Sequence, residues 1–200
     1  MPLELLGAFV LFAFVTSITP GPNNMMLLAS GVNFGVRRTI PHMLGISIGF
    51  LLLVVAVGLG LHQLFERFPA TYTALRYAGG AYLLYLAWKI ARSGAPEAKG
   101  ENAARPMTFL QAAAFQWVNP KAWVMAVGAI ATYLPANSWI GNVVLIATLF
   151  AVVNLPSVGV WTILGSLLRR WLEDPLRLRL FNVGMAALLV ASLYPLFTRT

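Results

Sequence analysis

The sequence predicts an all-α integral membrane protein with about six transmembrane helices, arranged as two inverted repeats of three helices each. Hydrophobic residues make up 59% of the 200 residues and charged residues 10%, with a mean hydropathy of +0.77. A soluble domain is about half apolar and about a quarter charged. The apolar residues gather in six runs, near residues 5–30, 41–61, 72–90, 108–134, 139–168 and 180–197. Each run has about the length that crosses a bilayer, roughly 20 residues.

The order of the runs indicates one domain made of two halves. The polar stretch at residues 92–106 separates the third run from the fourth. We therefore expect a single transporter domain over residues 1–200, with one repeat at about 1–91, a loop at about 92–107 and a second repeat at about 108–200. Three spans per half make the halves inverted. The first run of each half is broken near its middle, at Pro20 and Pro120, and broken helices at corresponding positions of inverted repeats are typical of transporters.

The basic residues predict how the chain lies across the membrane, because cytoplasmic loops are enriched in Lys and Arg. Lys121 lies inside the fourth apolar run and is left out of this comparison. Ten of the other basic residues lie at the loops after the first, third and fifth runs: Arg37, Arg38, Lys89, Arg92, Lys99, Arg105, Arg169, Arg170, Arg177 and Arg179. The opposite side carries three, Arg67, Arg76 and Arg199. The stretch at residues 92–106 is therefore expected in the cytoplasm and both termini outside it.

Composition excludes several other classes of protein. The chain has no Cys, which excludes disulfides, thiolate metal sites and a Cys nucleophile. The chain has a net charge of +8. Its basic residues lie beside the apolar runs, as in proteins that face an anionic membrane surface, so we expect no nucleic acid as a partner. No Asp or Glu lies inside any apolar run, and hydrolytic chemistry needs a base, an acid or a metal in the site. We therefore expect that the protein is not an enzyme and that it binds no cofactor and no metal.

The proline breaks supply backbone groups that could bind a ligand. Proline within a helix leaves the carbonyl four residues earlier without its hydrogen bond. The carbonyls expected to be freed by Pro20, Pro22 and Pro120 belong to Thr16, Ile18 and Gln116. The helical segments that restart beyond the breaks, near residues 23–25 and 121–123, should present unpaired N–H groups at a positive dipole end, which suits a carboxylate. The alternative is a packing kink, since Pro and Gly are common in transmembrane helices.

Lys121 is the most informative single residue. It lies near the centre of the fourth run, where a cation costs at least about 2.5 kcal/mol, and it has no acidic partner within the runs. Snorkelling would require a helix end, so a substrate carboxylate is the natural partner. The predicted substrate-binding residues are Pro20, Gly21, Pro22, Asn23, Asn24, Gln116, Asn119, Pro120, Lys121 and Asn154. Lys121 and His42 are the candidates for carrying a proton, and a cap or interface role is the alternative for His42.

Three segments together resemble the LysE/RhtB family of bacterial amino-acid exporters. These are TPGPN at residues 19–23, the stretch 82–89 that follows GG at 79–80, and NPKA at 119–122. The resemblance covers nearly the whole chain. It implies an efflux carrier for amino acids in the bacterial inner membrane, coupled to protons, embedded in the lipid bilayer and homodimeric.

The residues favour a neutral zwitterionic amino acid as the cargo. A lysine or arginine would bring a further cation beside Lys121 with no buried carboxylate to offset it, although backbone carbonyls could hold a cation. Two rival functions stay open. A cation or heavy-metal exporter would want Cys, acidic or several His ligands, and a non-transporting membrane assembly protein would leave Lys121 unexplained.

Overall fold

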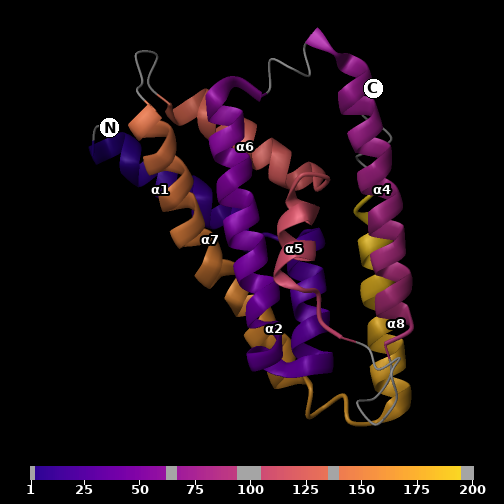
Figure 1. Ribbon diagram of the computed structural model, residues 1–200. Coiled ribbons are helices and arrows are strands. Elements are labelled where there is room, and N and C mark those ends of the chain that lie inside the picture. The colour runs from indigo at the N-terminus through magenta and orange to yellow at the C-terminus, as the bar shows by residue number, and fades with distance from the viewer. Residues whose placement is uncertain (1–2, 62–66, 94–104, 135–139, 195–200) are drawn as a thin grey trace.

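The structure is a computed structural model that describes residues 3–61, 67–93, 105–134 and 140–194. The described residues form helices and no strand, which confirms the all-α prediction. The helices are α1 (Leu3–Ile18), α2 (Pro22–Ala56), η1 (Val57–Leu61), α4 (Pro69–Ala91), α5 (Phe109–Gln116), α6 (Pro120–Tyr133), α7 (Ile140–Leu168) and α8 (Pro175–Ala191). Figure 1 shows them as a bundle of long, steeply inclined helices.

Helix α2 turns back on itself at Gly35. This glycine has a φ of 75° and a ψ of 171° inside the helix, a backbone conformation that glycine adopts without steric cost. The hydroxyls of Ser30 and Thr39 lie 2.8 Å apart, whereas nine residues of straight helix would separate them by about 13 Å. Residues 22–34 and 36–56 are therefore two antiparallel segments, and the exposed Arg37 and Arg38 lie at the turn between them.

Proline begins several of the helices, because its missing N–H and fixed φ suit the first helical position. The helices that start in this way are α2 at Pro22, α4 at Pro69, α6 at Pro120 and α8 at Pro175. Thr108 caps α5 through a reciprocal capping box with Gln111. Two of these prolines, Pro22 and Pro120, restart the helix after the predicted breaks, since α1 ends at Ile18 and α5 ends at Gln116.

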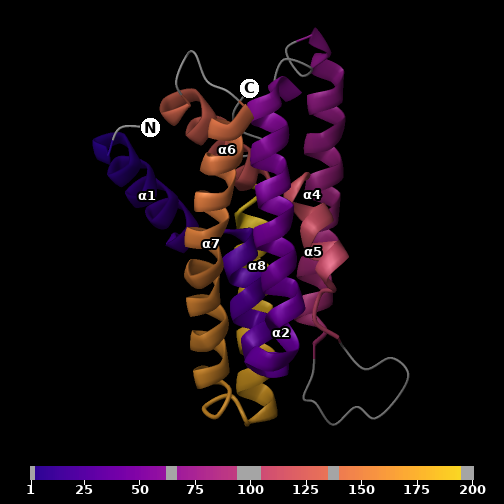
Figure 2. The same cartoon turned by 60° about the vertical axis from the view of Figure 1, so that its left-hand side comes forward.

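Close backbone contact between helices holds the centre of the bundle together. Helix α7 packs most extensively against α2, and Figure 2 shows the two lying side by side with α1 at an angle to them. Gly31 and Gly165 face the backbone of the opposite helix so closely that a Cβ on either would meet a carbonyl oxygen. Phe50 stacks edge-on to Phe150 at 4.7 Å, and Phe9 does so at 5.6 Å. These contacts join α1, α2 and α7 beneath the first break.

The outer surface of the bundle is apolar. Large apolar side chains are exposed on most of the long helices, including Leu11, Leu52, Leu84, Val152 and Leu180, as expected where lipid replaces water. Two helices, Pro22–Leu61 and Ile140–Leu168, are long and apolar enough to cross a membrane by length and composition, and the first contains the turn at Gly35. The six-span count and the inverted relation of the halves stay predictions.

Candidate functional site

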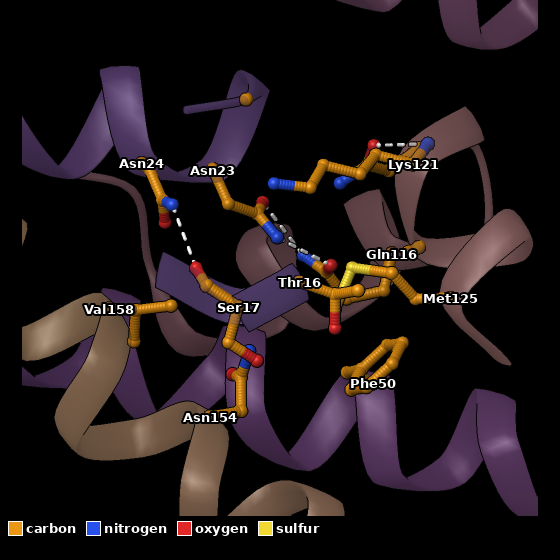
Figure 3. Close-up of a pocket in the computed structure, with 13 residues that line it drawn as sticks. Thr16, Ser17, Asn23, Asn24, Phe50, Gln116, Lys121, Met125, Asn154 and Val158 are labelled. Carbon is orange, nitrogen blue, oxygen red and sulfur yellow. Dashed lines mark hydrogen bonds between the residues drawn. The ribbon is translucent and has the colours of Figure 1, made fainter. Parts of the chain in front are cut away.

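The two helix breaks lie next to each other and share a pocket. The chain leaves the helical conformation between Ile18 and Pro22 and again between Gln116 and Pro120. The pocket between them has an empty volume of about 330 Å³, including the part that opens to solvent. It is lined by Thr16, Ser17, Gly21, Asn23, Asn24, Phe50, Gln116, Asn119, Lys121, Ala122, Met125, Asn154 and Val158. Figure 3 shows its polar side chains converging from α1, α2, α5, α6 and α7.

Lys121 crosses from the second break to the first. Its ammonium donates to the carbonyl oxygen of Thr19 at 2.6 Å, to the Thr19 hydroxyl at 3.1 Å and to the carbonyl oxygen of Pro20 at 3.3 Å. The stem lies against Gly21, where a Cβ would come within 2.7 Å of Lys121 Cδ. Glycine at this position therefore makes room for the lysine. The sequence left Lys121 without a protein partner, and the structure supplies one in backbone oxygens.

Asn23 and Gln116 form a reciprocal pair of amides. Asn23 Nδ2 donates to Gln116 Oε1 at 2.8 Å, and Gln116 Nε2 donates to Asn23 Oδ1 at 3.2 Å (Figure 3). Gln116 is fully buried and also donates to the carbonyl of Ala112 at 2.9 Å. The pair ties the start of α2 to the end of α5, so the two breaks are linked beside Lys121 by neutral hydrogen bonds.

Asn24 and Asn154 hold the end of α1 from the other side. Asn24 Nδ2 donates to the carbonyls of Ser17 at 2.9 Å and Thr19 at 2.8 Å. Asn154 Nδ2 donates to the Ser17 hydroxyl at 3.1 Å, while Asn154 Oδ1 accepts from Ser47 at 3.2 Å. Both asparagines are buried. Side-chain amides therefore satisfy backbone that the break leaves exposed, which buried polar groups require.

The three carbonyls that the prolines were expected to free from the helical pattern accept hydrogen bonds from other groups in the structure, so they are not open to a ligand. The Thr16 carbonyl accepts from the Thr19 hydroxyl at 3.0 Å, and the Ile18 carbonyl accepts from Trp161 Nε1 at 3.0 Å. The backbone N–H of Asn119 donates to the Gln116 carbonyl at 3.4 Å. The oxygens that face the cation instead belong to Thr19 and Pro20, which lie in the break after α1 ends at Ile18.

The helix starts beyond the breaks are capped only in part. At α6 the Asn119 side chain accepts from the N–H of Lys121 at 3.1 Å, and the Asn119 carbonyl accepts from Trp123. At α2 the Met25 N–H bonds to the carbonyl of Gly21, and Gly21 has no side chain with which to cap residues 23 and 24. Within the part of the chain that the structure describes, the donors left unpaired are the N–H groups of Asn23 and Asn24 in α2 and of Ala122 in α6, and all three residues line the pocket.

Most of the predicted residues meet here. Gly21, Asn23, Asn24, Gln116, Asn119, Lys121 and Asn154 line the pocket, whereas Pro20, Pro22 and Pro120 shape the breaks behind it. His42 does not join them and lines a different cavity. Sequence reasoning missed the hydroxyls of Thr16, Ser17 and Thr19 and the apolar wall of Phe50, Met125 and Val158. A cluster of hydroxyl residues just before a Pro–Gly–Pro break was a usable signal for the first three.

A polar pocket between two interrupted helices, set in a bundle with an apolar outer surface, defines a membrane transporter. The chain matches the LysE type translocator family over residues 14–192. It is 34% identical over 191 residues to the cysteine/O-acetylserine efflux proteins of Escherichia coli (strain K12) and Shigella sonnei (strain Ss046), which covers 95% of this chain and 96% of each relative. The chain belongs to the LysE type translocator family, whose members are transporters and not enzymes. No solved structure matches it.

Proposed function

We propose that this protein exports a small, neutral amino acid across the bacterial inner membrane by holding it between the two helix breaks. The observation that carries the proposal is the reach of Lys121 from one break to the backbone oxygens of the other. Family membership supports export. The names of the relatives, cysteine/O-acetylserine efflux proteins, support a small, neutral amino acid as the cargo.

The two charged ends of an amino acid match the two kinds of group in the pocket. The carboxylate would pair with the Lys121 ammonium and with the first amides of α2, where Asn23 and Asn24 begin the helix. Charge-assisted hydrogen bonds of this kind are among the strongest in proteins. The ammonium would take the oxygens of Thr19 and Pro20 that Lys121 now occupies. Binding would thus move Lys121 from backbone oxygens to the cargo.

The pocket favours a short, uncharged side chain. None of its lining residues is acidic, so a second cation on the cargo would have no carboxylate to pair with. Phe50, Met125 and Val158 form an apolar wall against which a short side chain can pack.

The remaining parts of the proposed transport cycle rest on the predicted architecture and on the resemblance to the LysE/RhtB family. Two inverted repeats of three spans would rock against each other to open the pocket to one side at a time. Inward movement of protons would drive export, with Lys121 and His42 as the groups that carry a proton. A homodimer is the proposed assembly. A heavy-metal exporter and a membrane assembly protein are the rival functions.

Efflux from reconstituted vesicles tests this function. Vesicles loaded with labelled cysteine, O-acetylserine, threonine, leucine or lysine are given a proton gradient, and release is timed with and without an uncoupler. We expect release of the small neutral amino acids, little release of lysine, and loss of release with the uncoupler. Release of none of the amino acids from vesicles that contain folded protein would reject the proposal.

A further inference from the structure

A second cavity lies further along α2 and shares no lining residue with the first. It has an empty volume of about 420 Å³, including the part open to solvent. Its polar lining consists of Ser30, Asn33, His42, Lys89, Ser93 and Arg105. Ser30 and Asn33 come from the same segment of α2 as Asn23 of the first pocket. Ser30 follows Asn23 by seven positions, which corresponds to a rise of about 10 Å along the helix.

His42 is the unusual member of this cavity. Its side chain is 1% exposed, and both ring nitrogens lack a hydrogen-bond partner within the described part of the chain. A buried polar group without a partner is costly, so each case calls for an explanation. The neutral ring carries one N–H donor. This donor is therefore available to a molecule that enters the cavity.

The other neutral polar side chains that line the cavity already have hydrogen-bond partners of their own. The Ser30 hydroxyl bonds to Thr39 at 2.8 Å, and Asn33 Nδ2 bonds to the carbonyl of Ala29 at 2.8 Å. The Ser93 hydroxyl donates to the Lys89 carbonyl at 3.1 Å. None of them supplies His42 with a partner. A hydrogen-bond partner for the His42 ring would have to come from a molecule in the cavity.

Two cations complete the lining. Lys89 comes from the last turn of α4, and Arg105 comes from the segment that leads to α5. No residue that lines this cavity carries a negative charge. A carboxylate satisfies all three groups at once, because its two oxygens accept from an ammonium, a guanidinium and an imidazole N–H.

We propose that this cavity is a second binding site, which takes a small carboxylate before it reaches the pocket at Lys121. The proposal rests on the proposed function in one respect, namely that the carboxylate belongs to the exported amino acid. Lys89 and Arg105 lie on the predicted cytoplasmic side, so a cargo leaving the cell meets this site first. Cations that line a cleft raise the local concentration of an anionic group.

Histidine NMR of the purified protein in detergent tests the site without any transport step. The chain has two histidines, and a His62→Gln variant assigns the remaining ring signal to His42. Acetate is the probe, since it is the smallest carboxylate with an apolar end. We expect the His42 signal to shift and saturate with acetate. Arg105→Gln and Lys89→Gln should each raise the apparent Kd by about tenfold, as for a lost interaction of about 1.4 kcal/mol.

Arg92→Gln is the matched control. Arg92 is also a cation near the end of α4, but its guanidinium lies 4.6 Å from the ring of Trp88 and it does not line the cavity. This variant should titrate like the parent. A His42 signal that ignores acetate, or that responds equally in Arg105→Gln and the parent, overturns the proposal.

Phosphate on a lipid headgroup shares the chemistry of a carboxylate, so the titration is repeated with short-chain phosphatidylglycerol. A shift with the lipid but none with acetate overturns the proposal and assigns the cavity to lipid. The outcome is independent of the proposed export. If acetate binds at His42 and the vesicles release no amino acid, the second site stands and the proposed function fails. If the vesicles release amino acid and acetate does not bind at His42, the proposed function stands and the second site fails.

Discussion

The ammonium of Lys121 lies 2.6 Å from the carbonyl oxygen of Thr19, 102 positions earlier in the chain. Each residue is next to a proline that interrupts its helix. The first break supplies carbonyl oxygens and the second supplies a cation, so the groups at one break are hydrogen-bond partners for those at the other. An amino acid carries a carboxylate that can pair with the cation and an ammonium that can donate to the carbonyl oxygens, and this makes the contact a natural place for it to bind.

Gly21 is expected to control the position of Lys121. In Gly21→Ala the new Cβ would meet Lys121 Cδ at 2.7 Å and Nζ at 3.1 Å, so the lysine must move away from Thr19. The φ of −179° at Gly21 is extended and accepts alanine without strain. We expect normal abundance with efflux reduced about tenfold, equivalent to about 1.4 kcal/mol, as measured by release from vesicles.

The control for this variant is Gly7→Ala, since a Cβ at Gly7 meets nothing within 4 Å. Release from vesicles with Gly7→Ala should equal that of the parent. An equal loss in Gly21→Ala and Gly7→Ala would show that the effect at Gly21 does not come from displacing Lys121.

The amide pair of Asn23 and Gln116 predicts strong coupling between distant parts of the chain. Asn23→Leu leaves the buried Gln116 amide without this partner, and Gln116→Met leaves the half-buried Asn23 amide without it, at a cost of about 1–3 kcal/mol. The double variant removes both polar groups and should cost less than the sum, by about 0.5–3 kcal/mol. Thermal unfolding in detergent measures the stability of the parent, the two single variants and the double variant. Simple additivity would mean that the pair does not stabilise the link between the breaks.

The proline breaks should matter more for transport than for folding. Pro20→Ala and Pro120→Ala allow the helix to continue and draw the carbonyls of the break back into helical hydrogen bonds. We expect both variants to reach the membrane at parental abundance and to lose most of their efflux. Parental efflux from both would show that the breaks are packing features.

The orientation can be tested simply because the chain contains no Cys. A single cysteine at Ala98, in the stretch expected in the cytoplasm, should react with an impermeant maleimide in inside-out vesicles and not in intact cells. Ala136→Cys, between the fourth and fifth apolar runs, is the matched control and should show the opposite pattern. Labelling of Ala98→Cys in intact cells would reverse the predicted orientation.

The sequence predicted the breaks and many of the residues beside them, because proline and asparagine act on the backbone within a few positions. Lys121 stood out because a cation in an apolar run is costly. The partners could not be predicted in the same way. Trp161 reaches the Ile18 carbonyl across 143 positions, and only the packing of α7 brings them together. His42 belongs to another cavity for the same reason, since the turn at Gly35 places it beside Lys89 and not beside Lys121.

Efflux by Lys121→Met tests the central claim most directly. The change keeps an apolar stem of similar length and removes a cation that costs about 2.5 kcal/mol or more in a membrane, and the Thr19 carbonyl keeps its bond from Asn24. The variant should therefore fold and insert as well as the parent. Lys99→Met, which removes a lysine from the polar stretch between the halves, is the control. We predict that Lys121→Met loses nearly all gradient-driven efflux of a small neutral amino acid at parental abundance. Efflux equal to that of the parent and of Lys99→Met would contradict it.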